Sequence, residues 1–312
     1  MLYSLQICLV NIEFRSGFYK GLILSTATHT MSNEKTALIP CPLCETKAHS
    51  PWGIENNYNC VRCDGCGILY VNPRPSSQHI DKAVQLGVHS AETLDVVGTR
   101  IGSKVATYNT LITSVFKDVI LRGKPISWLD VGAGFGELVE AVIQVSPKGS
   151  VIEGLEPMLP KVNNAKSRGL PMHAGYLDAI HRKYDFVSLI DVFSHIPDFK
   201  SFLEEVKSVL TLNGEVFMKT GNAADIGARC NFPGPLTLPD HLVFGGETHV
   251  IRFLEEAGFQ IISIRRERID GIAYSIRNVA KWILRRPVYL SFPYTSKSRT
   301  IFIRAKLHCE TS

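Results

Sequence analysis

Beyond residue 126 the chain alternates between two hydrophobic patterns. Short apolar runs, typical of buried strands, are separated by segments in which apolar residues recur every three or four positions, typical of amphipathic helices. The predicted strands span residues 126–132, 150–156, 171–175, 185–191, 214–220, 259–267 and 299–306. The predicted helices span residues 137–145, 160–168, 199–210 and 248–257, with Asn213-Gly214 and Gly258 ending two of them. Such alternation predicts an α/β fold whose mostly parallel sheet is covered by helices on both faces.

Three further regions precede this main domain, which we place at 126–312. Residues 76–125 show a helical pattern and form an expected linker or cap. Its apolar positions are Val105, Leu111, Ile112, Val115, Phe116, Val119 and Ile120. Residues 36–75 form a cysteine-rich module that ends in the stiff sequence NPRP. Residues 1–35 are an expected N-terminal extension, in which Met31 opens a plausible alternative start.

Composition fits one large and one small domain, with 45% hydrophobic and 20% charged residues in 312. The net charge of +5 is unevenly placed, because residues 264–306 hold eleven Lys or Arg and only two acids. Within them, one helical face carries Ile272, Ile276, Val279, Ala280 and Ile283, and the opposite face Arg277, Lys281 and Arg285. We interpret this segment as a helix packed on the domain with a solvated basic face, or as a surface for a phosphate-bearing or membrane-anchored partner.

No part of the sequence has the character of a membrane span or an export signal. No stretch approaches the roughly 20 apolar residues that cross a bilayer. The first 30 residues lack a basic segment before their short apolar run. We therefore expect a cytoplasmic protein, whose reduced cysteines favour metal binding over disulfides.

A glycine-rich loop follows the first predicted strand, in the sequence WLDVGAGFGELVE. It places Asp130, Gly132, Gly134 and Gly136 at alternate positions before a predicted helix, where glycines let the backbone approach a ligand closely. The next strand ends about twenty residues later in Glu156, an acid suited to binding the two hydroxyls of a ribose. Dinucleotide folds usually space this loop G-x-G-x-x-G. The spacing G-x-G-x-G with a preceding acid, which can contact an ammonium group, favours S-adenosylmethionine over NAD.

Five cysteines between positions 41 and 66 form three C-x-x-C steps: Cys41/Cys44, Cys60/Cys63 and Cys63/Cys66. A tetrahedral zinc site of this kind takes four thiolates. Pairing the first step with either later step leaves a spacer of 15 or 18 residues, and both are usual for a zinc ribbon. The spacing predicts a zinc module but leaves open which later step binds.

Residues 126–260 resemble the class I S-adenosylmethionine-dependent methyltransferases. The similar stretches are LDVGAGFG, GLEP, YDFVSLIDVFSHIPD, LTLNGEVFMKTGN and PDHLVFGGETHVIRFLEEAGF. The resemblance implies a Rossmann-like sheet of seven strands whose last strand, RTIFIRAK, is antiparallel. It also implies that Asp130 and the glycines Gly132, Gly134 and Gly136 hold the methionine end of the cofactor, that Glu156 holds its ribose, and that Tyr176, Leu177 and Asp191 flank the adenine and the sulfonium.

The N-terminal module resembles that of a subset of these enzymes, which includes deoxysugar C-methyltransferases. Their module has the form CPxC…CxxCG followed by an aromatic residue and an Asn-Pro segment, and this chain is similar in CDGCG and LYVNPRP. Those enzymes continue into a further C-terminal domain, which we do not expect after the seventh predicted strand of this sequence. The resemblance favours Cys41, Cys44, Cys63 and Cys66 as zinc ligands and leaves Cys60 spare. Four thiolates leave no open position for water, so the Zn²⁺ would be structural.

The resemblance also points to two candidate bases. In the sugar C-methyltransferases a similar acid-His step before a late helix supplies the base, which here corresponds to Asp240 and His241. His195 follows the fourth strand, where ligands bind, and is the second candidate. His249 lies within a helical pattern and is interpreted as structural.

These patterns predict a methyltransferase that acts on a small molecule, with a nucleotide-activated sugar or a glycan or envelope precursor as the leading class of acceptor. One alternative is an RNA methyltransferase that uses the zinc module and the basic segment, although DVFSHIPD lacks the Asn/Asp-Pro-Pro-aromatic turn of enzymes that methylate base amines. The other is a non-catalytic scaffold that keeps the cofactor fold. The glycine loop and Glu156 argue against that scaffold.

Overall fold

The computed structural model describes most of the chain after residue 35. The described residues are 36–86, 88–90, 92–93, 101–232, 234–268, 276, 279–281, 283–284 and 297–308. The predicted N-terminal extension lies outside them. Among these residues, no helix is long and apolar enough to cross a membrane.

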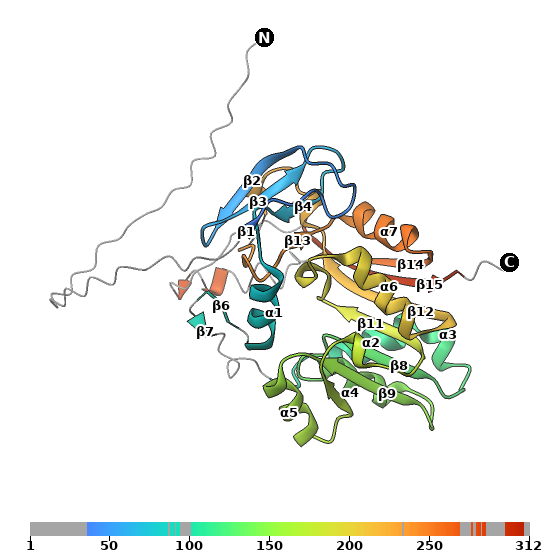
Figure 1. The fold of residues 1–312 in the computed structure, drawn as a ribbon. Helices are drawn as coiled ribbons and strands as arrows, with labels where there is room; N and C mark the ends of the chain where they lie inside the picture. Colours follow the sequence, from blue (N-terminus) through green and yellow to red (C-terminus); the bar gives the residue numbers. More distant parts are fainter. Residues whose placement is uncertain are drawn as a thin grey trace, which may run out of the picture.

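A seven-stranded sheet forms the centre of the structure, in the order β10-β9-β8-β11-β12-β15-β14 (Figure 1). Its strands are β8 (Ser127–Val131), β9 (Val151–Glu156), β10 (Met172–Ala174), β11 (Tyr184–Ile190), β12 (Leu210–Gly221), β14 (Phe259–Arg268) and β15 (Arg299–Leu307). The strands from β10 to β12 pair in parallel, whereas β15 is antiparallel to both neighbours. The predicted α/β fold with an antiparallel last strand is confirmed.

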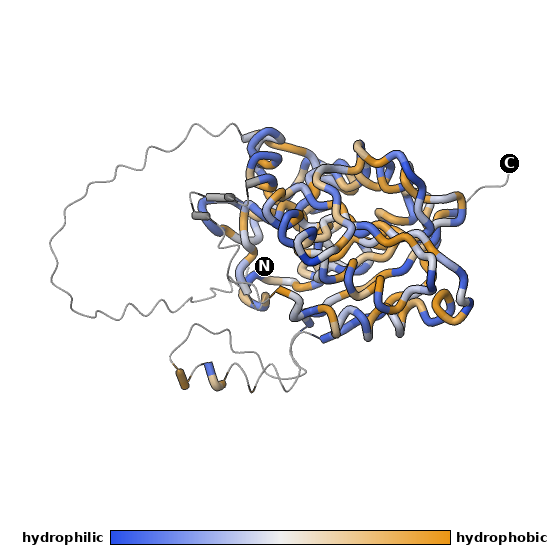
Figure 2. Tube along the Cα trace, turned by 90° about the horizontal axis from the view of Figure 1, so that it is seen from below, coloured by the Kyte–Doolittle hydropathy of each residue, from blue (hydrophilic) through white to orange (hydrophobic). Residues whose placement is uncertain are grey.

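Helices cover both faces of this sheet. Alternate residues of each strand point to opposite faces, so Trp128 and Phe186 belong to one core while Leu129 and Val187 belong to the other. The first core is covered by α2 (Val105–Val115), α3 (Lys117–Ile120), α4 (Glu137–Val145) and α5 (Leu159–Ser167). The second is covered by α6 (Phe199–Val209) and α7 (Glu247–Glu256). Apolar segments accordingly run through the interior of the body in Figure 2.

One predicted helix end is wrong. Helix α6 ends at Val209, and β12 begins at Leu210, so Asn213-Gly214 lies within the strand and does not end the helix. The reason is tertiary: Leu210 is buried and pairs with Tyr184 of β11, which draws the chain into the sheet four residues early. Gly258, with a φ of +87°, does follow α7 as predicted.

The cysteine module is built into the main domain. It contains β1 (Thr36–Ala37), β2 (His49–Glu55), β3 (Tyr58–Cys63), β4 (Leu69–Val71) and β5 (Arg74–Pro75). Its sheet has the order β13-β4-β3-β2, and β13 (Val243–Phe244) comes from the chain between β12 and α7. Cys41 and Tyr70 share one core with Phe193 and Phe253. The module and the main domain are therefore one packing unit.

The segment after the module is only partly helical. Helix α1 (Ser77–Leu86) is followed by a small hairpin of β6 (Val88–Ser90) and β7 (Glu92–Thr93), before α2 and α3. Of the predicted basic helix, Ile276, Val279 and Ile283 are described and are 66%, 48% and 68% exposed, so these apolar side chains do not pack on the domain. Ile272, Arg277 and Arg285 lie outside the described residues.

The shared core predicts a single unfolding transition. Phe253 is 1% exposed and packs against Phe199 with ring centroids 5.4 Å apart. Phe253→Ala should lower the free energy of unfolding by about 3–5 kcal/mol. Denaturation followed by circular dichroism and by fluorescence of Trp52, with the other tryptophans replaced by Phe, should give one shared, lowered midpoint. Leu121→Ala, at a site 74% exposed, is the control and should change stability by less than about 0.5 kcal/mol. Separate midpoints for module and sheet would contradict the shared core.

Candidate functional site

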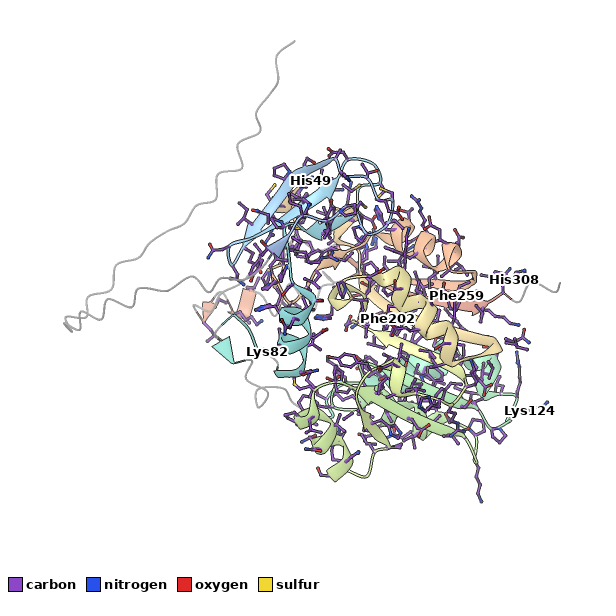
Figure 3. The ribbon with its side chains drawn as sticks, viewed as in Figure 1. His49, Lys82, Lys124, Phe202, Phe259 and His308 are labelled. Carbon is purple, nitrogen blue, oxygen red and sulfur yellow. The ribbon has the colours of Figure 1, made fainter. Side chains whose placement is uncertain are left out.

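A cavity of about 610 Å³ opens at the carboxyl ends of β8, β9 and β11. Ligands bind at this edge in parallel α/β sheets, where the strand order reverses. Side chains of α1 (Ile80, Val84) and of α6 (Phe202) line it together with residues that follow the strands. Figure 3 labels Lys82 on α1 and Phe202 on α6.

The glycine loop between β8 and α4 has the backbone that only glycine adopts readily. Gly132, Gly134 and Gly136 have φ values of +70°, +55° and +76°. A Cβ on Gly132 would lie 2.7 Å from Val192, so a larger residue there would displace the cavity wall. A Cβ on Gly134 would meet no atom within 4 Å, so the backbone there is open to a ligand.

Asp130 lies beneath the loop, not on the cavity wall. Its carboxylate accepts a hydrogen bond of 2.6 Å from Ser188, whose hydroxyl accepts one from Trp128. The side chain is almost completely buried, and this burial raises the pKa of Asp130 to about 7 despite the Ser188 bond, with the charge of Glu156 adding to the rise. Tyr108 of α2 was not a candidate from the sequence. Burial raises the pKa of its hydroxyl, and the nearby charges of Asp191 and Asp130 raise it further.

Glu156 ends β9 and lines the cavity. One carboxylate oxygen accepts from the N–H of Gly134 at 2.9 Å and the other from the N–H of Met158 at 3.0 Å. Lys161 of α5 lies 3.9 Å from it and is the only Lys or Arg among the described residues that line the cavity. Glu156 therefore ties the glycine loop to the next strand and keeps lone pairs for a ligand.

Tyr176, Leu177 and Asp191 also line the cavity. Leu177 starts the short helix η1 (Leu177–Ala179) and is buried, whereas Tyr176 is 41% exposed. Asp191 directly follows β11 with a φ of +60°, and its carboxylate is 2.5 Å from Lys219. The structure thus brings Gly132, Glu156 and these three residues together on one cavity wall.

His195 lines the same cavity at the end of η2 (Phe193–His195). Its Nδ1 lies 3.0 Å from Oδ1 of Asp240 and 3.0 Å from the backbone carbonyl of Asp240. Both partners accept hydrogen bonds, so Nδ1 carries the proton and Nε2 is the basic nitrogen of the neutral ring. Burial lowers the pKa of His195, but the hydrogen bond and charge of Asp240 outweigh it and the pKa is raised above its usual value.

His241 does not line the cavity, although Asp240 beside it does. Its ring meets that of His195 edge to face, with centroids 4.7 Å apart. Burial, and then the charge of His195, lower the pKa of His241. Ligand atoms of His195, Asp240 and His241 lie within 4.8 Å of one another. Because Nδ1 of His195 donates a hydrogen bond to Asp240, the pair of His195 and Asp240 resembles a proton-transfer dyad and not a metal centre. His195 is better placed as a base than His241.

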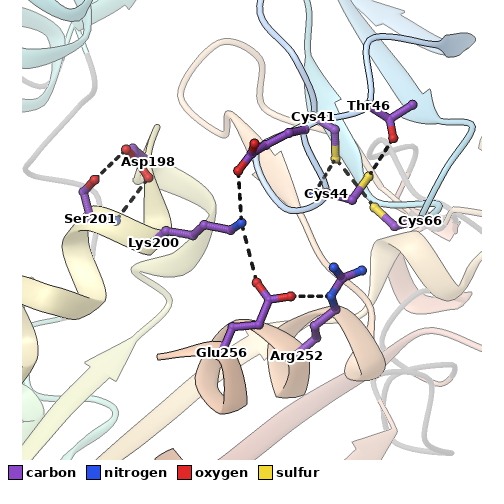
Figure 4. A network of polar contacts seen from close by, with 10 residues as sticks. Cys41, Cys44, Thr46, Cys66, Asp198, Lys200, Ser201, Arg252 and Glu256 are labelled. Carbon is purple, nitrogen blue, oxygen red and sulfur yellow. Dashed lines mark hydrogen bonds and ion pairs between the residues drawn. The ribbon is translucent and has the colours of Figure 1, made fainter. Parts of the chain in front are cut away.

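Four cysteines of the module lie together. The Sγ atoms of Cys41, Cys44, Cys63 and Cys66 lie within 4.8 Å of one another. Cys41 and Cys66 are 3.6 Å apart and Cys44 and Cys63 are 3.4 Å apart, too far for disulfides but close to the edge of a tetrahedron of about 2.3 Å metal–sulfur bonds. Figure 4 shows three of these cysteines, Cys41, Cys44 and Cys66, near Lys200 of α6 and Arg252 and Glu256 of α7.

Cys60 is separate from this cluster. It is fully buried among Leu69, Val71 and Phe244, and burial raises the pKa of its thiol to about 12. It therefore behaves as an apolar core residue. His249, interpreted from sequence as structural, accepts from the N–H of Gly246 through Nδ1 and bonds the carbonyl of Cys66 through Nε2 at 2.7 Å.

Comparison with known proteins shows the family to which the chain belongs. The model of a family described as "Methyltransferase domain" matches residues 108–264, half of the chain. A ubiquinone biosynthesis O-methyltransferase of Haemophilus ducreyi is 29% identical over 116 residues, which are 33% of this chain and 47% of that protein. The chain thus spans about half the length of that relative. A putative sarcosine dimethylglycine methyltransferase of Galdieria sulphuraria has a similar structure, with 15% identity, a TM-score of 0.50, and 73% of this chain and 97% of that chain covered. This last likeness concerns the fold alone.

The dyad predicts a pH-dependent effect of Asp240→Asn. The carboxylate raises the pKa of His195, so its loss should lower that pKa, as measured by NMR titration of the imidazole with His195→Gln for assignment. A group with a raised folded-state pKa stabilises the fold below its unfolded pKa of about 6.5, and this stabilisation is lost as pH rises through the folded value. Asp240→Asn should therefore destabilise the fold more at pH 5.5 than at pH 8. Equal losses at both pH values would refute the charged contact.

Proposed function

This chain belongs to the methyltransferase-domain family, and on that premise we propose that it transfers a methyl group from S-adenosylmethionine to a small-molecule acceptor. One observation carries the proposal. A single cavity is lined at once by Glu156 and Tyr176, suited to the donor, and by the His195–Asp240 dyad, suited to the acceptor. Methyl transfer requires the donor and the acceptor to meet in one aligned site.

The cavity wall fits S-adenosylmethionine. Glu156 would bind the ribose, Tyr176 and Leu177 would flank the adenine, and Gly132, with the open space beside Gly134, would admit the methionine end. Asp130 lies below the glycine loop and would not contact the cofactor. It would instead help to position the loop, and the negative charge of its carboxylate would attract the positively charged donor. The donor supplies a methyl group activated by a positively charged sulfur, which the acids of this wall would attract.

His195 is the proposed base. Nε2 of His195 would take the proton that the acceptor atom loses as it gains the methyl group, and Asp240 would stabilise the resulting imidazolium. A pKa raised above its usual value helps the imidazole to hold the proton that it takes from the acceptor. His241 would support the ring of His195 from its edge.

The cavity favours a compact acceptor. Ile80, Val84, Ile196 and Phe202 give it apolar walls, which suit a ring better than a nucleic acid strand. Asp81, Asp198 and Glu205 also line it. These acids would repel a phosphate, so in a nucleotide-activated sugar or glycan precursor the ring would enter and the phosphates would remain outside. A quinone-type ring, as the name of the Haemophilus ducreyi relative suggests, is the second candidate.

The proposal predicts label transfer into a small molecule. Purified protein with methyl-labelled S-adenosylmethionine and a cell extract should label the small-molecule fraction and leave the RNA fraction unlabelled. Glu156→Ala should abolish labelling and weaken affinity for S-adenosylhomocysteine about 10- to 100-fold in calorimetry, because two charge-assisted acceptors are lost. His195→Gln should bind S-adenosylhomocysteine normally but transfer slowly. Ribonuclease-sensitive label would indicate an RNA enzyme, and absence of cofactor binding would indicate a scaffold.

We further propose that Cys41, Cys44, Cys63 and Cys66 hold a structural Zn²⁺. The donor set supports this, because its sulfur atoms are near tetrahedral spacing and the N–H groups of Cys44 and Cys66 each lie 3.5 Å from a cluster sulfur. The metal would cross-link a segment of roughly forty residues that is too small for a core of its own. A reducing compartment such as the cytoplasm would keep the thiols available.

Cysteine variants test this metal site. Cys66→Ser should lose zinc, measured by mass spectrometry of the purified protein, and should lower the thermal midpoint, because the site then holds three thiolates. Cys60→Ala should retain one zinc per chain, since Cys60 lies in the apolar cluster. Zinc retained in Cys66→Ser and lost in Cys60→Ala would reverse the assignment.

A further inference from the structure

A carboxylate of the cysteine module binds the loop that carries Asp240. Glu55, at the end of β2, accepts hydrogen bonds from three successive backbone N–H groups: Leu236 at 2.8 Å, Thr237 at 2.5 Å and Leu238 at 3.3 Å. Successive amides that converge on one anion form a nest that fixes the local backbone. The Glu55 side chain is 20% exposed and also faces Arg229 at 3.6 Å.

The loop needs such an anchor because part of its backbone is unfavourable. Thr237 has a φ of +63°, a left-handed conformation that β-branched residues rarely adopt. Asn56, next to Glu55, donates to the carbonyl of Leu238 at 2.7 Å. Leu236 and Leu238 are buried in one cluster with Leu69 of β4, so the module holds this stretch by hydrogen bonds and by packing.

The anchored stretch leads directly to the dyad. The N–H of His241 donates to the carbonyl of Thr237 at 3.0 Å, which closes a turn around Asp240. The next residue, Leu242, donates to the carbonyl of Ser194, one residue before His195, at 2.7 Å. The conformation at Thr237 thus determines where the Asp240 carboxylate lies relative to His195.

We propose that Glu55 is a positioning residue for the catalytic dyad, acting through the 236–241 turn to hold Asp240 against His195. The proposal rests on the proposed function for its catalytic meaning, but its geometric content can be tested without an acceptor. It assigns the cysteine module a part in building the active site as well as in stabilising the fold.

The titration of His195 reports this positioning. The charged or titratable groups that act on His195 or its partner ring are Asp240 and His241 of the loop, Lys161 of α5 and Asp191 after β11. Of these, Asp240 makes the direct hydrogen bond, and only the loop groups depend on Glu55. A displaced Asp240 would therefore lower the pKa of His195, while Lys161 and Asp191 would stay in place.

The experiment compares Glu55→Gln with Glu45→Gln. Glu45 is a matched control because it is a carboxylate of the same module, 78% exposed and paired with Lys200 at 3.5 Å, away from the loop. NMR titration of the His195 imidazole should show a fall in its pKa of about half a unit to one unit in Glu55→Gln and no change in Glu45→Gln. Calorimetry with S-adenosylhomocysteine should give affinities within about twofold of wild type for both, because the cofactor wall belongs to other elements.

A second variant covers the case in which Glu55→Gln does not fold. Asn56→Asp removes the donor to Leu238 but keeps a residue that tolerates the φ of +50° at this position, and it should shift the His195 titration in the same direction. Once an acceptor is known, Glu55→Gln should lower kcat several-fold with little change in the KM for S-adenosylmethionine.

An unchanged His195 titration in a folded Glu55→Gln protein would overturn the proposal. A shifted titration would support it whether or not methyl transfer is observed, so that its failure and a failure of the proposed function remain distinguishable. A pKa shift of equal size in Glu45→Gln would also overturn it, since the effect would then follow the charge of the module and not the loop.

Discussion

The pairing of β13 with β4 is the contact on which the rest of the structure depends. It joins only Val243 with Tyr70 and Phe244 with Leu69, yet it brings the module and the loop before α7 into one sheet. Tyr70 and Leu69 are fully buried. Without this docking their side chains would face water, and a segment of roughly forty residues could not bury them by itself. The backbone of the long loop between β12 and α7 would also lose its hydrogen-bond partners in the module. The module and the loop therefore stabilise each other.

Charged side chains complete this junction by bonding backbone groups. Arg62 of β3 donates to the carbonyls of Gly67, Ala224 and Ile226. Arg74 donates to the carbonyl of Pro197, and Glu55 accepts from the nest at Thr237. Buried backbone groups of irregular loops must find such partners, and bonds to charged groups are stronger than neutral ones. These contacts determine the path of the loops and therefore the walls of the cavity.

Local patterns predicted the sheet, and they named several residues that line the cavity, among them Gly132, Glu156 and Asp191. The apolar runs, the glycine loop and Glu156 follow one another along the chain, and their positions in the fold follow from strand order alone. Whether Cys60 or Cys66 is the fourth cysteine of the cluster could have been decided from the strand that carries Cys60 and Cys63. Cys63 and Cys60 are three residues apart in β3, so they point to opposite faces, one to the cluster and the other to the apolar core. Had residues 58–63 been predicted to form a strand, the alternation of side chains would have excluded Cys60 from the cysteine cluster.

The relation of His195 to His241 could not be predicted, because it depends on contacts between segments 45 residues apart. The sequence favoured His241 for its neighbouring acid, but Asp240 directs both its carboxylate and its carbonyl to His195 instead. The two halves of the dyad belong to different parts of the fold. His195 follows a strand of the central sheet, whereas Asp240 lies on the loop that the module holds. His195 and Asp240 therefore meet as they do only when the module is docked, which, if the proposed function holds, gives a physical reason for the cysteine module to precede the central sheet.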